Sequence, residues 1–458
     1  MMFAGIRQAA LSEAAVAAVQ RAGRSVRNVA MLGDSITFDW WNLTSVSTSA
    51  ATRNDDAVWL SDASFEHMNH GYASWLGPLS LGALQVTYNG AVNGAEVILG
   101  GVSDLTFSLE QQVNDLLAHP KWKSIDEVVL MFGTNDSDAN STQSVALVIQ
   151  AYAAQLARLA GKGITVCTIM PVDASIEDGS TGGSSPRWAW IRRFNSALKQ
   201  FARNSGGRIK MADCNAAVVD PASATGRAKT GMLRDSVHPT SKAAQLMGAA
   251  VVAALMQGQS CPPDWIVSNA DDIALSNTPQ GPLNIVPNGL FINGASPGTG
   301  WTHNNFVGAT GTHSLVSSPT GFGQAVQFAT TGAAKGDQFR VITANLSSLV
   351  ATGDRLFAQA WVRIPASSKV IPSLRLVVVV GGVTYLRSCL QNSTLPAYIE
   401  GPDGTFDVLM RTPEIVIPAG SITNLQVSMT GYYGGAAGPT NVLMSHAECR
   451  KVLPDLYA

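Results

Sequence analysis

The chain has 458 residues, of which 46% are apolar and 14% are charged, and its formal net charge is −2. This length exceeds what one ordinary core needs, so two domains are expected. The weak charge gives no electrostatic reason to expect nucleic acid as a partner. The longest apolar run with helical spacing, residues 248–256, is far shorter than the roughly 20 residues that span a bilayer, so no membrane insertion is expected.

The N-terminal segment, residues 1–27, is rich in alanine but interrupted by polar residues such as Arg7 and Glu13. It lacks the unbroken apolar stretch of a secretory signal, and we predict a short helical arm. The five cysteines are scattered and lack metal-ligand spacing, so we expect mostly buried thiols, no metal and no cofactor. They are Cys167, Cys214, Cys261, Cys389 and Cys449.

Residues 28–258 alternate short β-rich runs with helical periodicity, which predicts a parallel sheet covered by helices on both faces. Strands are expected at residues 28–32, 86–89, 127–132, 164–169 and 208–212. Helices are expected at residues 105–117, 145–159, 190–204 and 240–256. In sheets of this kind, ligands bind beyond the carboxyl ends of the strands.

Residues 259–282 are rich in Pro, Ser and Asn without periodicity, and we predict a linker. Residues 283–458 change character: short alternating runs at 357–364, 373–380 and 424–430 predict an independently folding antiparallel β-sandwich. Its opening residues, 284–289 followed by 300–302, resemble the start of jelly-roll carbohydrate-binding modules.

Two segments far apart in the chain carry the strongest chemical signal. Ser35, in Gly33-Asp34-Ser35, directly follows the first predicted strand. Asp235 precedes His238 by three residues on a loop that opens a helix, so both side chains can point the same way. A serine hydroxyl becomes a good nucleophile when a histidine removes its proton and a carboxylate fixes the tautomer of that histidine. We therefore predict that Ser35, His238 and Asp235 are catalytic.

Gly94 and Asn135 also follow predicted strands, so they are expected at the same edge of the sheet. Ser, Gly, Asn and His in this order resemble the four blocks of the SGNH (GDSL-type) hydrolase superfamily over about residues 28–256. The resemblance implies a flavodoxin-like three-layer sandwich with a five-stranded parallel sheet. It also implies an oxyanion hole made of the backbone N–H of Ser35, Gly94 and Asn135, in which donors stabilise the anion formed on attack.

The remaining side chains near these motifs have weaker signals. Asp34 is expected to order the turn around Ser35, and Asp136 to fix its own loop. Trp40, Trp41, Trp188 and Trp190 are candidate substrate-binding platforms on which sugars would stack. Large aromatic residues are more often simply part of a core, and this alternative stays open for all four. Trp301, Tyr432 and Tyr433 are weaker candidates for sugar contacts in the second domain.

These observations predict a serine esterase that removes ester groups, and we expect these to be O-acetyl groups on a polysaccharide. Two alternatives stay open: a lipolytic esterase or thioesterase on acyl chains, and a non-catalytic glycan- or receptor-binding tail module. The composition also resembles phage tail-associated esterases. That resemblance implies an extracellular or virion-associated protein that forms a homo-oligomer, a trimer if it is tail-associated. A cytoplasmic location stays open.

Overall fold

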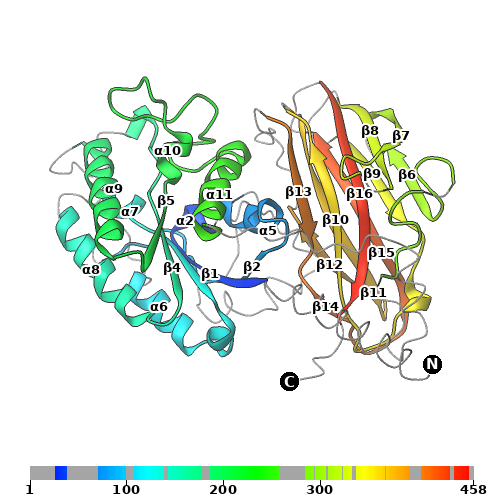
Figure 1. Cartoon of the computed structure of the whole chain (residues 1–458), viewed down its shortest axis with the longest axis horizontal. Coiled ribbons are helices and arrows are strands. Elements are labelled where there is room, and N and C mark those ends of the chain that lie inside the picture. Colours follow the sequence, from blue (N-terminus) through cyan, green and yellow to red (C-terminus); the bar gives the residue numbers. More distant parts are fainter. Residues whose placement is uncertain are drawn as a thin grey trace, which may run out of the picture.

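The computed structural model shows two lobes, an α/β lobe followed by an all-β lobe (Figure 1). The residues that it describes are 26–38, 71–98, 108–138, 143–176, 186–257, 284–292, 294–305, 308–321, 323–332, 337–366, 368–390, 404–433 and 438–452. The arm predicted for residues 1–27 lies outside them except at its end, where Arg27 begins the first strand. The predicted linker, residues 259–282, lies outside them entirely.

The α/β lobe is built on a five-stranded sheet whose strands are all parallel and follow the order β2-β1-β3-β4-β5. The strands are β1 (Arg27–Gly33), β2 (Leu84–Asn89), β3 (Glu127–Met131), β4 (Gly163–Cys167) and β5 (Ile209–Ala212). The central positions of the three inner strands, β1, β3 and β4, are buried, because helices cover both faces. The flavodoxin-like three-layer sandwich expected from the sequence is confirmed.

Three long helices pack together on one face of this sheet: α6 (Leu109–Ala118), α8 (Val145–Arg158) and α9 (Arg187–Asn204). On the other face, α11 (Ser241–Leu255) packs against η1 (Tyr72–Trp75) and α5 (Leu76–Leu79) (Figure 1). Side-chain oxygens of Ser108, Ser144 and Thr240 cap α6, α8 and α11, each accepting a backbone N–H of the first turn.

Short helical segments occupy the loops of this lobe: α2 (Ser35–Phe38), η2 (Pro120–Ser124), α7 (Thr134–Asp138), η3 (Ala174–Ile176) and α10 (Cys214–Val218). Two of them, α2 and α7, begin within three residues after a strand ends, so they place their first side chains at the carboxyl edge of the sheet. Within the described part of the chain, no helix is long and apolar enough to cross a membrane.

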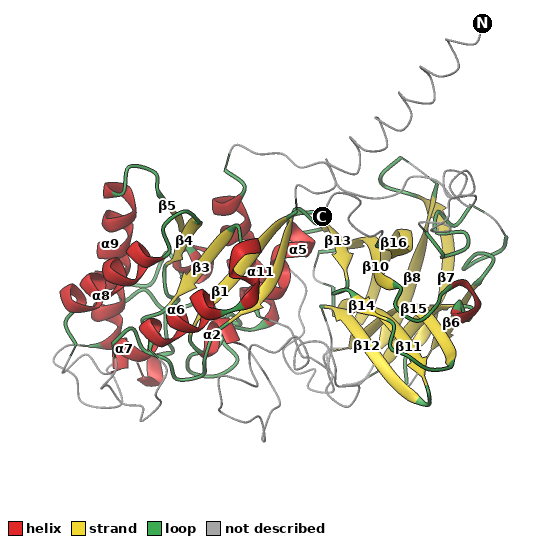
Figure 2. Cartoon of the chain, turned by 90° about the horizontal axis from the view of Figure 1, so that it is seen from below, coloured by secondary structure: helices red, strands yellow, loops and turns green. Residues whose placement is uncertain are grey.

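The second lobe consists of strands, as Figure 2 shows, with a single short helical turn, η4 (Ser347–Leu349), among its described residues. Its first strands are β6 (Trp301–Asn305), β7 (Thr310–Ser317), β8 (Gln324–Gly332), β9 (Gln338–Thr343), β10 (Arg355–Ile364) and β11 (Val370–Val380). The later ones are β12 (Val383–Cys389), β13 (Phe406–Arg411), β14 (Ile415–Val416), β15 (Ile422–Tyr433) and β16 (Gly438–Lys451). They form two antiparallel sheets.

The strand order of these two sheets is that of a jelly roll. One sheet runs β13-β10-β16-β8-β7, with β14 pairing with β10, and the other runs β12-β11-β15-β9-β6. The chain passes from one sheet to the other between β6 and β7, β8 and β9, β9 and β10, β10 and β11, β12 and β13, β14 and β15, and β15 and β16. Alternate side chains of β10, including Leu356, Ala358 and Ala360, point into the core between the sheets. The predicted β-sandwich is therefore confirmed, including its jelly-roll topology.

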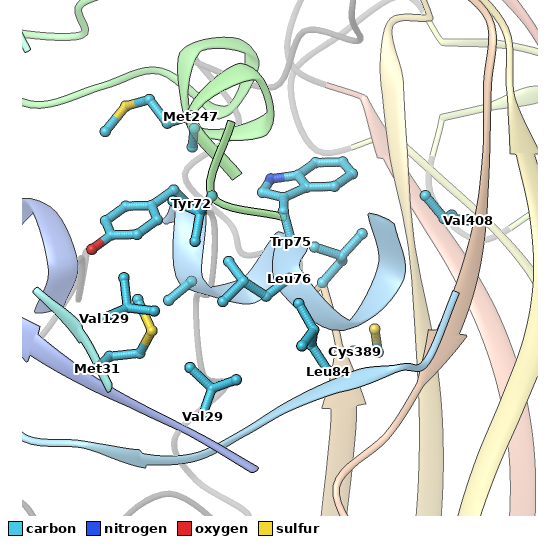
Figure 3. Packing of buried hydrophobic residues seen from close by; sticks show 14 of the residues in the cluster. Val29, Met31, Tyr72, Trp75, Leu76, Leu84, Val129, Met247, Cys389 and Val408 are labelled. Carbon is cyan, nitrogen blue, oxygen red and sulfur yellow. The ribbon is translucent and has the colours of Figure 1, made fainter. Parts of the chain in front are cut away.

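The two lobes meet where α5 packs against β13. The rings of Trp75 and Phe406 have centroids 5.7 Å apart, and Trp75 is fully buried. Figure 3 shows Trp75 and Leu84 of the α/β lobe on the side that faces Cys389 and Val408 of the sandwich. The independent folding of residues 283–458 stays a prediction, and this apolar contact is what a truncated chain would expose to water.

Four of the cysteines, Cys167, Cys214, Cys389 and Cys449, are free and buried, as the sequence predicts for most of them. Cys261 lies outside the described residues.

Candidate active site

The backbone of the turn that carries Ser35 is held by hydrogen bonds with the side chains of Gln112 and Asp34. Gly33 ends β1, and a Cβ atom at this position would clash with the carbonyl oxygen of Met131 on the neighbouring strand. Gln112 of α6 clamps Gly33: its Oε1 accepts the Gly33 N–H at 2.9 Å, and its Nε2 donates to the Gly33 carbonyl at 2.8 Å. Asp34 accepts the N–H of Ile36 at 3.0 Å, so it orders the turn as predicted. Ser35 is thereby fixed at the carboxyl end of β1.

The loop that carries Asp235 and His238 is closed by its own hydrogen bonds. One carboxylate oxygen of Asp235 accepts the N–H of Val237 at 2.8 Å and the N–H of His238 at 2.7 Å. The N–H of Arg234 donates to the carbonyl of His238 at 3.0 Å. The carboxylate and the imidazole are therefore oriented by a rigid turn before any contact with Ser35.

Ser35, His238 and Asp235 form one hydrogen-bonded chain, although Ser35 and His238 are far apart in the sequence. The Oγ of Ser35 lies 2.9 Å from Nε2 of His238, and Nδ1 of His238 lies 3.0 Å from Oδ2 of Asp235. Burial by itself raises the pKa of Asp235, but hydrogen bonds from the side chain and backbone of His238 outweigh it and hold this pKa well below its usual range. Asp235 is consequently ionised at neutral pH and favours a proton on Nδ1, which leaves Nε2 free to accept one.

Gly94 and Asn135, the other two predicted residues, lie in neighbouring segments that are tied to each other. The backbone of Gly94 is in the left-handed region, with φ of 75°, a conformation that glycine adopts at little cost. Nδ2 of Asn135 donates one hydrogen bond to the carbonyl of Ala95 at 2.9 Å. A side-chain amide has two N–H donors, so a second one is available at Asn135.

Asp136 strengthens the tie between these two segments. It is fully buried, and its two carboxylate oxygens accept the N–H of Val97 at 3.1 and 3.0 Å. Asp136 therefore fixes its loop, as predicted, and holds it against the loop of Gly94. Burial raises the pKa of Asp136 from 3.8 to about 7, and the negative charge of Glu96 acts in the same direction.

Because of this raised pKa, the free energy of unfolding depends on pH. Replacing Asp136 with a neutral residue should remove that dependence. Between pH 4 and pH 7 the folded chain holds a proton on Asp136 that the unfolded chain has lost, so the free energy of unfolding falls as pH rises through this window. Asp136→Asn keeps the shape but cannot ionise. We expect wild type to lose stability relative to Asp136→Asn from pH 4.5 to pH 7.5 in thermal unfolding. A difference that is constant over this range, or that changes in the opposite direction, would contradict the assignment.

Arg187 holds the segment of Asn135 by hydrogen bonds, and sequence analysis did not identify this residue. Its side chain is only 4% exposed; Nη2 donates to the carbonyl of Thr134 and Nε to Oγ of Ser137, both at 2.8 Å. Nη1 also lies 3.5 Å from the carboxylate of Asp138. No pattern in the sequence marks this arginine. Gln112 was missed too, although a glutamine between Leu109 and Val113 on the buried face of a helix is a usable signal.

The four predicted tryptophan platforms have different outcomes. Trp40 and Trp41 lie outside the described residues. The prediction for Trp190 is wrong: its side chain is 1% exposed, it stacks on Phe194, and its indole N–H donates to the carbonyl of Gln143. It is a core residue of α9 with no face open to a sugar. Trp188 is half-buried, with the guanidinium of Arg192 centred 5.8 Å from its ring, and its role stays a prediction.

Among the weaker candidates for sugar contacts in the second domain, the structure describes the side chains of Trp301 and Tyr433. Trp301 and Tyr433 are buried, and the hydroxyl of Tyr433 lies 2.8 Å from that of Thr330 inside the sandwich. Both are core residues, and these two predictions are wrong.

Across the described residues, no group of three or more His, Cys, Asp or Glu side chains is placed to hold a metal ion. What the site does present is a serine hydroxyl hydrogen-bonded to an imidazole that is oriented by an ionised carboxylate. This arrangement, at the carboxyl edge of a parallel sheet, is typical of hydrolases that use a serine nucleophile.

Comparison with known proteins agrees with this class. Residues 31–246 match the GDSL-like Lipase/Acylhydrolase family, and the matched region contains all five predicted residues of the site. This part of the chain is therefore similar to that family of acylhydrolases. Among curated proteins, no significant match is found.

Several solved structures are similar to about half of this chain. A carbohydrate acetylesterase from Sinorhizobium meliloti is 17% identical, with a TM-score of 0.34, and the match covers 50% of this chain and 98% of that one. An aryl esterase from M. smegmatis is 16% identical, with a TM-score of 0.33 and the same coverage of 50% and 98%. A GDSL-like lipase from Bacteroides thetaiotaomicron is 14% identical, with a TM-score of 0.34 and coverage of 51% and 89%.

Proposed function

We propose that the protein is a serine esterase that hydrolyses O-acetyl groups on a polysaccharide. The observation that carries the esterase part is the chain from Ser35 Oγ to His238 Nε2 and from His238 Nδ1 to Asp235, with distances of 2.9 and 3.0 Å. A module that only bound glycan would not need a serine that is hydrogen-bonded to a histidine oriented by an ionised aspartate. The structure therefore favours hydrolysis over the non-catalytic alternative.

In the first half of the reaction, Ser35 Oγ attacks the ester carbonyl carbon while His238 Nε2 takes the hydroxyl proton. The C=O bond becomes a C–O⁻ single bond, and the backbone N–H groups of Ser35 and Gly94 and the Nδ2 of Asn135 stabilise the oxyanion. The intermediate then expels the sugar oxygen, which receives the proton from His238. An acyl group remains on Ser35.

In the second half, a water molecule takes the place of the sugar hydroxyl. His238 Nε2 removes a proton from this water as it attacks the acyl carbonyl, and the same donors stabilise the second oxyanion. Collapse returns the proton to Ser35 and releases the carboxylic acid. The ionised Asp235 stabilises the imidazolium that forms in each half.

The acetyl and polysaccharide parts of the proposal depend on the second lobe. A β-sandwich joined to a hydrolase suits a polymeric carbohydrate, and the acyl groups on polysaccharides are mostly acetyl. The site is also partly open: the side chains of His238 and Asp235 are 27% and 51% exposed. A polymer can reach such a site without threading into a tunnel.

Hydrolysis of p-nitrophenyl esters of increasing acyl length tests the proposal. We expect kcat/KM to fall sharply from acetyl to butyryl and beyond, because a site for acetyl groups has no room adapted to longer chains. Equal or higher rates on octanoyl esters would favour the lipolytic alternative. Acetate release from acetylated polysaccharides would then identify the natural class of substrate.

A further inference from the structure

A pocket of about 150 Å³ lies between the two lobes, and none of the five residues of the candidate active site lines it. On the α/β side it is lined by β2 and η1, with the polar side chains of Ser74, Gln85 and Asn89. On the sandwich side it is lined by Arg387 and Ser388 of β12 and by Thr412. An engineered cavity of about this size binds one benzene molecule, so the volume suits a ligand with a single six-membered ring.

The charged group in this pocket is a buried arginine that lacks an acidic partner. Arg387 is 8% exposed, and no ion pair joins it to a carboxylate in the part of the chain that the structure describes. Its only hydrogen bonds there are to backbone carbonyls: Nη1 to Leu386 at 2.9 Å and Nε to Glu414 at a long 3.4 Å. Buried arginines are normally paired, because taking the charge out of water is costly.

The side chain of Glu414, whose backbone carbonyl accepts from Arg387, is already engaged. The carboxylate of Glu414 pairs with Nη2 of Arg355 at 2.6 Å and lies 3.9 Å from Nη2 of Arg411. Burial lowers the pKa of Arg387 from 12.5 to about 10, so the guanidinium still carries its charge at neutral pH. Nη2 of Arg387 thus belongs to a cation whose charge no carboxylate of the described residues compensates.

The remainder of the lining is largely apolar, but it holds a second cation and several polar side chains. Arg411 contributes the second guanidinium, stacked 3.7 Å from the ring centre of Phe357, and no acidic side chain is among the described residues that line the pocket. Hydroxyl and amide side chains of both lobes are also among the lining residues. Such groups hydrogen-bond sugar hydroxyls, while the planar fork of an arginine matches a carboxylate.

Three observations carry the inference: the charge of Arg387, which no described carboxylate compensates, the polar side chains among the lining, and the volume of the pocket. From them we infer that the pocket binds one carboxylate-bearing sugar unit, a hexuronate. The carboxylate pairs with Arg387, and the ring hydroxyls contact Ser74, Gln85 and Asn89. That the ligand is a sugar rests on the proposed function, whereas the carboxylate follows from the pocket alone. The site would hold an acidic polysaccharide across both lobes while Ser35 acts on another unit.

Calorimetric titration of the full chain with D-glucuronate tests this inference without using catalysis. We expect saturable binding of D-glucuronate and none of D-glucose, which has the same ring without the carboxylate. Arg387→Gln should weaken the binding by at least about tenfold, because a charge-assisted hydrogen bond contributes about 1.5–3 kcal/mol. Arg387→Lys, which keeps the charge but loses the fork, should bind with intermediate affinity.

Arg363→Gln is the matched control, because it removes an arginine of the same lobe that pairs with Asp407 and does not line the pocket. Its affinity should equal that of wild type. All variants should hydrolyse p-nitrophenyl acetate at the wild-type rate, so failure of the pocket and failure of the esterase proposal are distinguishable. Absence of D-glucuronate binding to wild type, equal binding of D-glucose, or tighter binding of inorganic phosphate would each overturn the inference.

Discussion

Ser35→Ala is expected to lower kcat on p-nitrophenyl acetate by on the order of a thousandfold or more, because loss of the nucleophile removes the acyl-enzyme pathway. Folding should be unaffected. Ser35 lies at a partly exposed strand end, and its turn is held by Gln112 and Asp34 rather than by the hydroxyl. Initial rates and thermal unfolding of the purified variant provide the two measurements.

Ser236→Ala is the matched control for this change. It removes a hydroxyl from the loop that carries Asp235 and His238 but takes nothing from the hydrogen-bonded chain. It should retain nearly full activity. If Ser35→Ala kept more than about a tenth of the wild-type turnover, Ser35 would not be the nucleophile.

Asp235→Asn is expected to lower kcat by about a thousandfold while leaving the loop intact. The asparagine oxygen can still accept the N–H groups of Val237 and His238, so the turn survives. Its amide, however, donates to Nδ1 of His238, which places the ring proton on Nε2 and leaves no acceptor for the proton of Ser35. The measurement is kcat over a range of pH, since a tautomer error persists even where the histidine is neutral.

Asp220→Asn is a close control for this second substitution. Asp220 also accepts the backbone N–H two residues ahead, that of Ala222 at 2.9 Å, but it belongs to a loop outside the site. Asp220→Asn should keep the wild-type rate, and an Asp235→Asn variant that is equally active would contradict the role of Asp235 in setting the tautomer of His238.

The parallel sheet was predictable because its signals are local. Five short apolar runs alternate with helical periodicity, and each predicted strand lies within two residues of the observed one. The expectation that Ser35, Gly94, Asn135 and His238 share one edge comes from the rule that ligands bind at the carboxyl ends of parallel strands. The contact between Ser35 and His238 agrees with it. The sandwich was predictable as a class from alternating patterns, and its topology from the resemblance of its opening residues.

The supporting residues were not predictable, because their roles depend on distant contacts. Arg187 lies about fifty residues from the carbonyl of Thr134 that it binds, and nothing in the local sequence distinguishes it from a surface arginine. Trp190 was wrongly predicted to bind substrate for the same reason. Its burial depends on contacts such as that with the carbonyl of Gln143, which the local sequence does not reveal. The contact between Trp75 and Phe406 joins two domains and has no local signature either.

The central claim, that Ser35 is an activated nucleophile, is tested most directly by covalent labelling with a fluorophosphonate followed by tryptic peptide mapping. The reagent reacts with serines that a histidine activates, and the tryptic peptide of residues 28–53 contains Ser35. We predict one adduct, on Ser35, formed by wild type and lost in both Ser35→Ala and His238→Ala. An adduct on any other residue, or no adduct on a folded wild-type chain, would contradict the account.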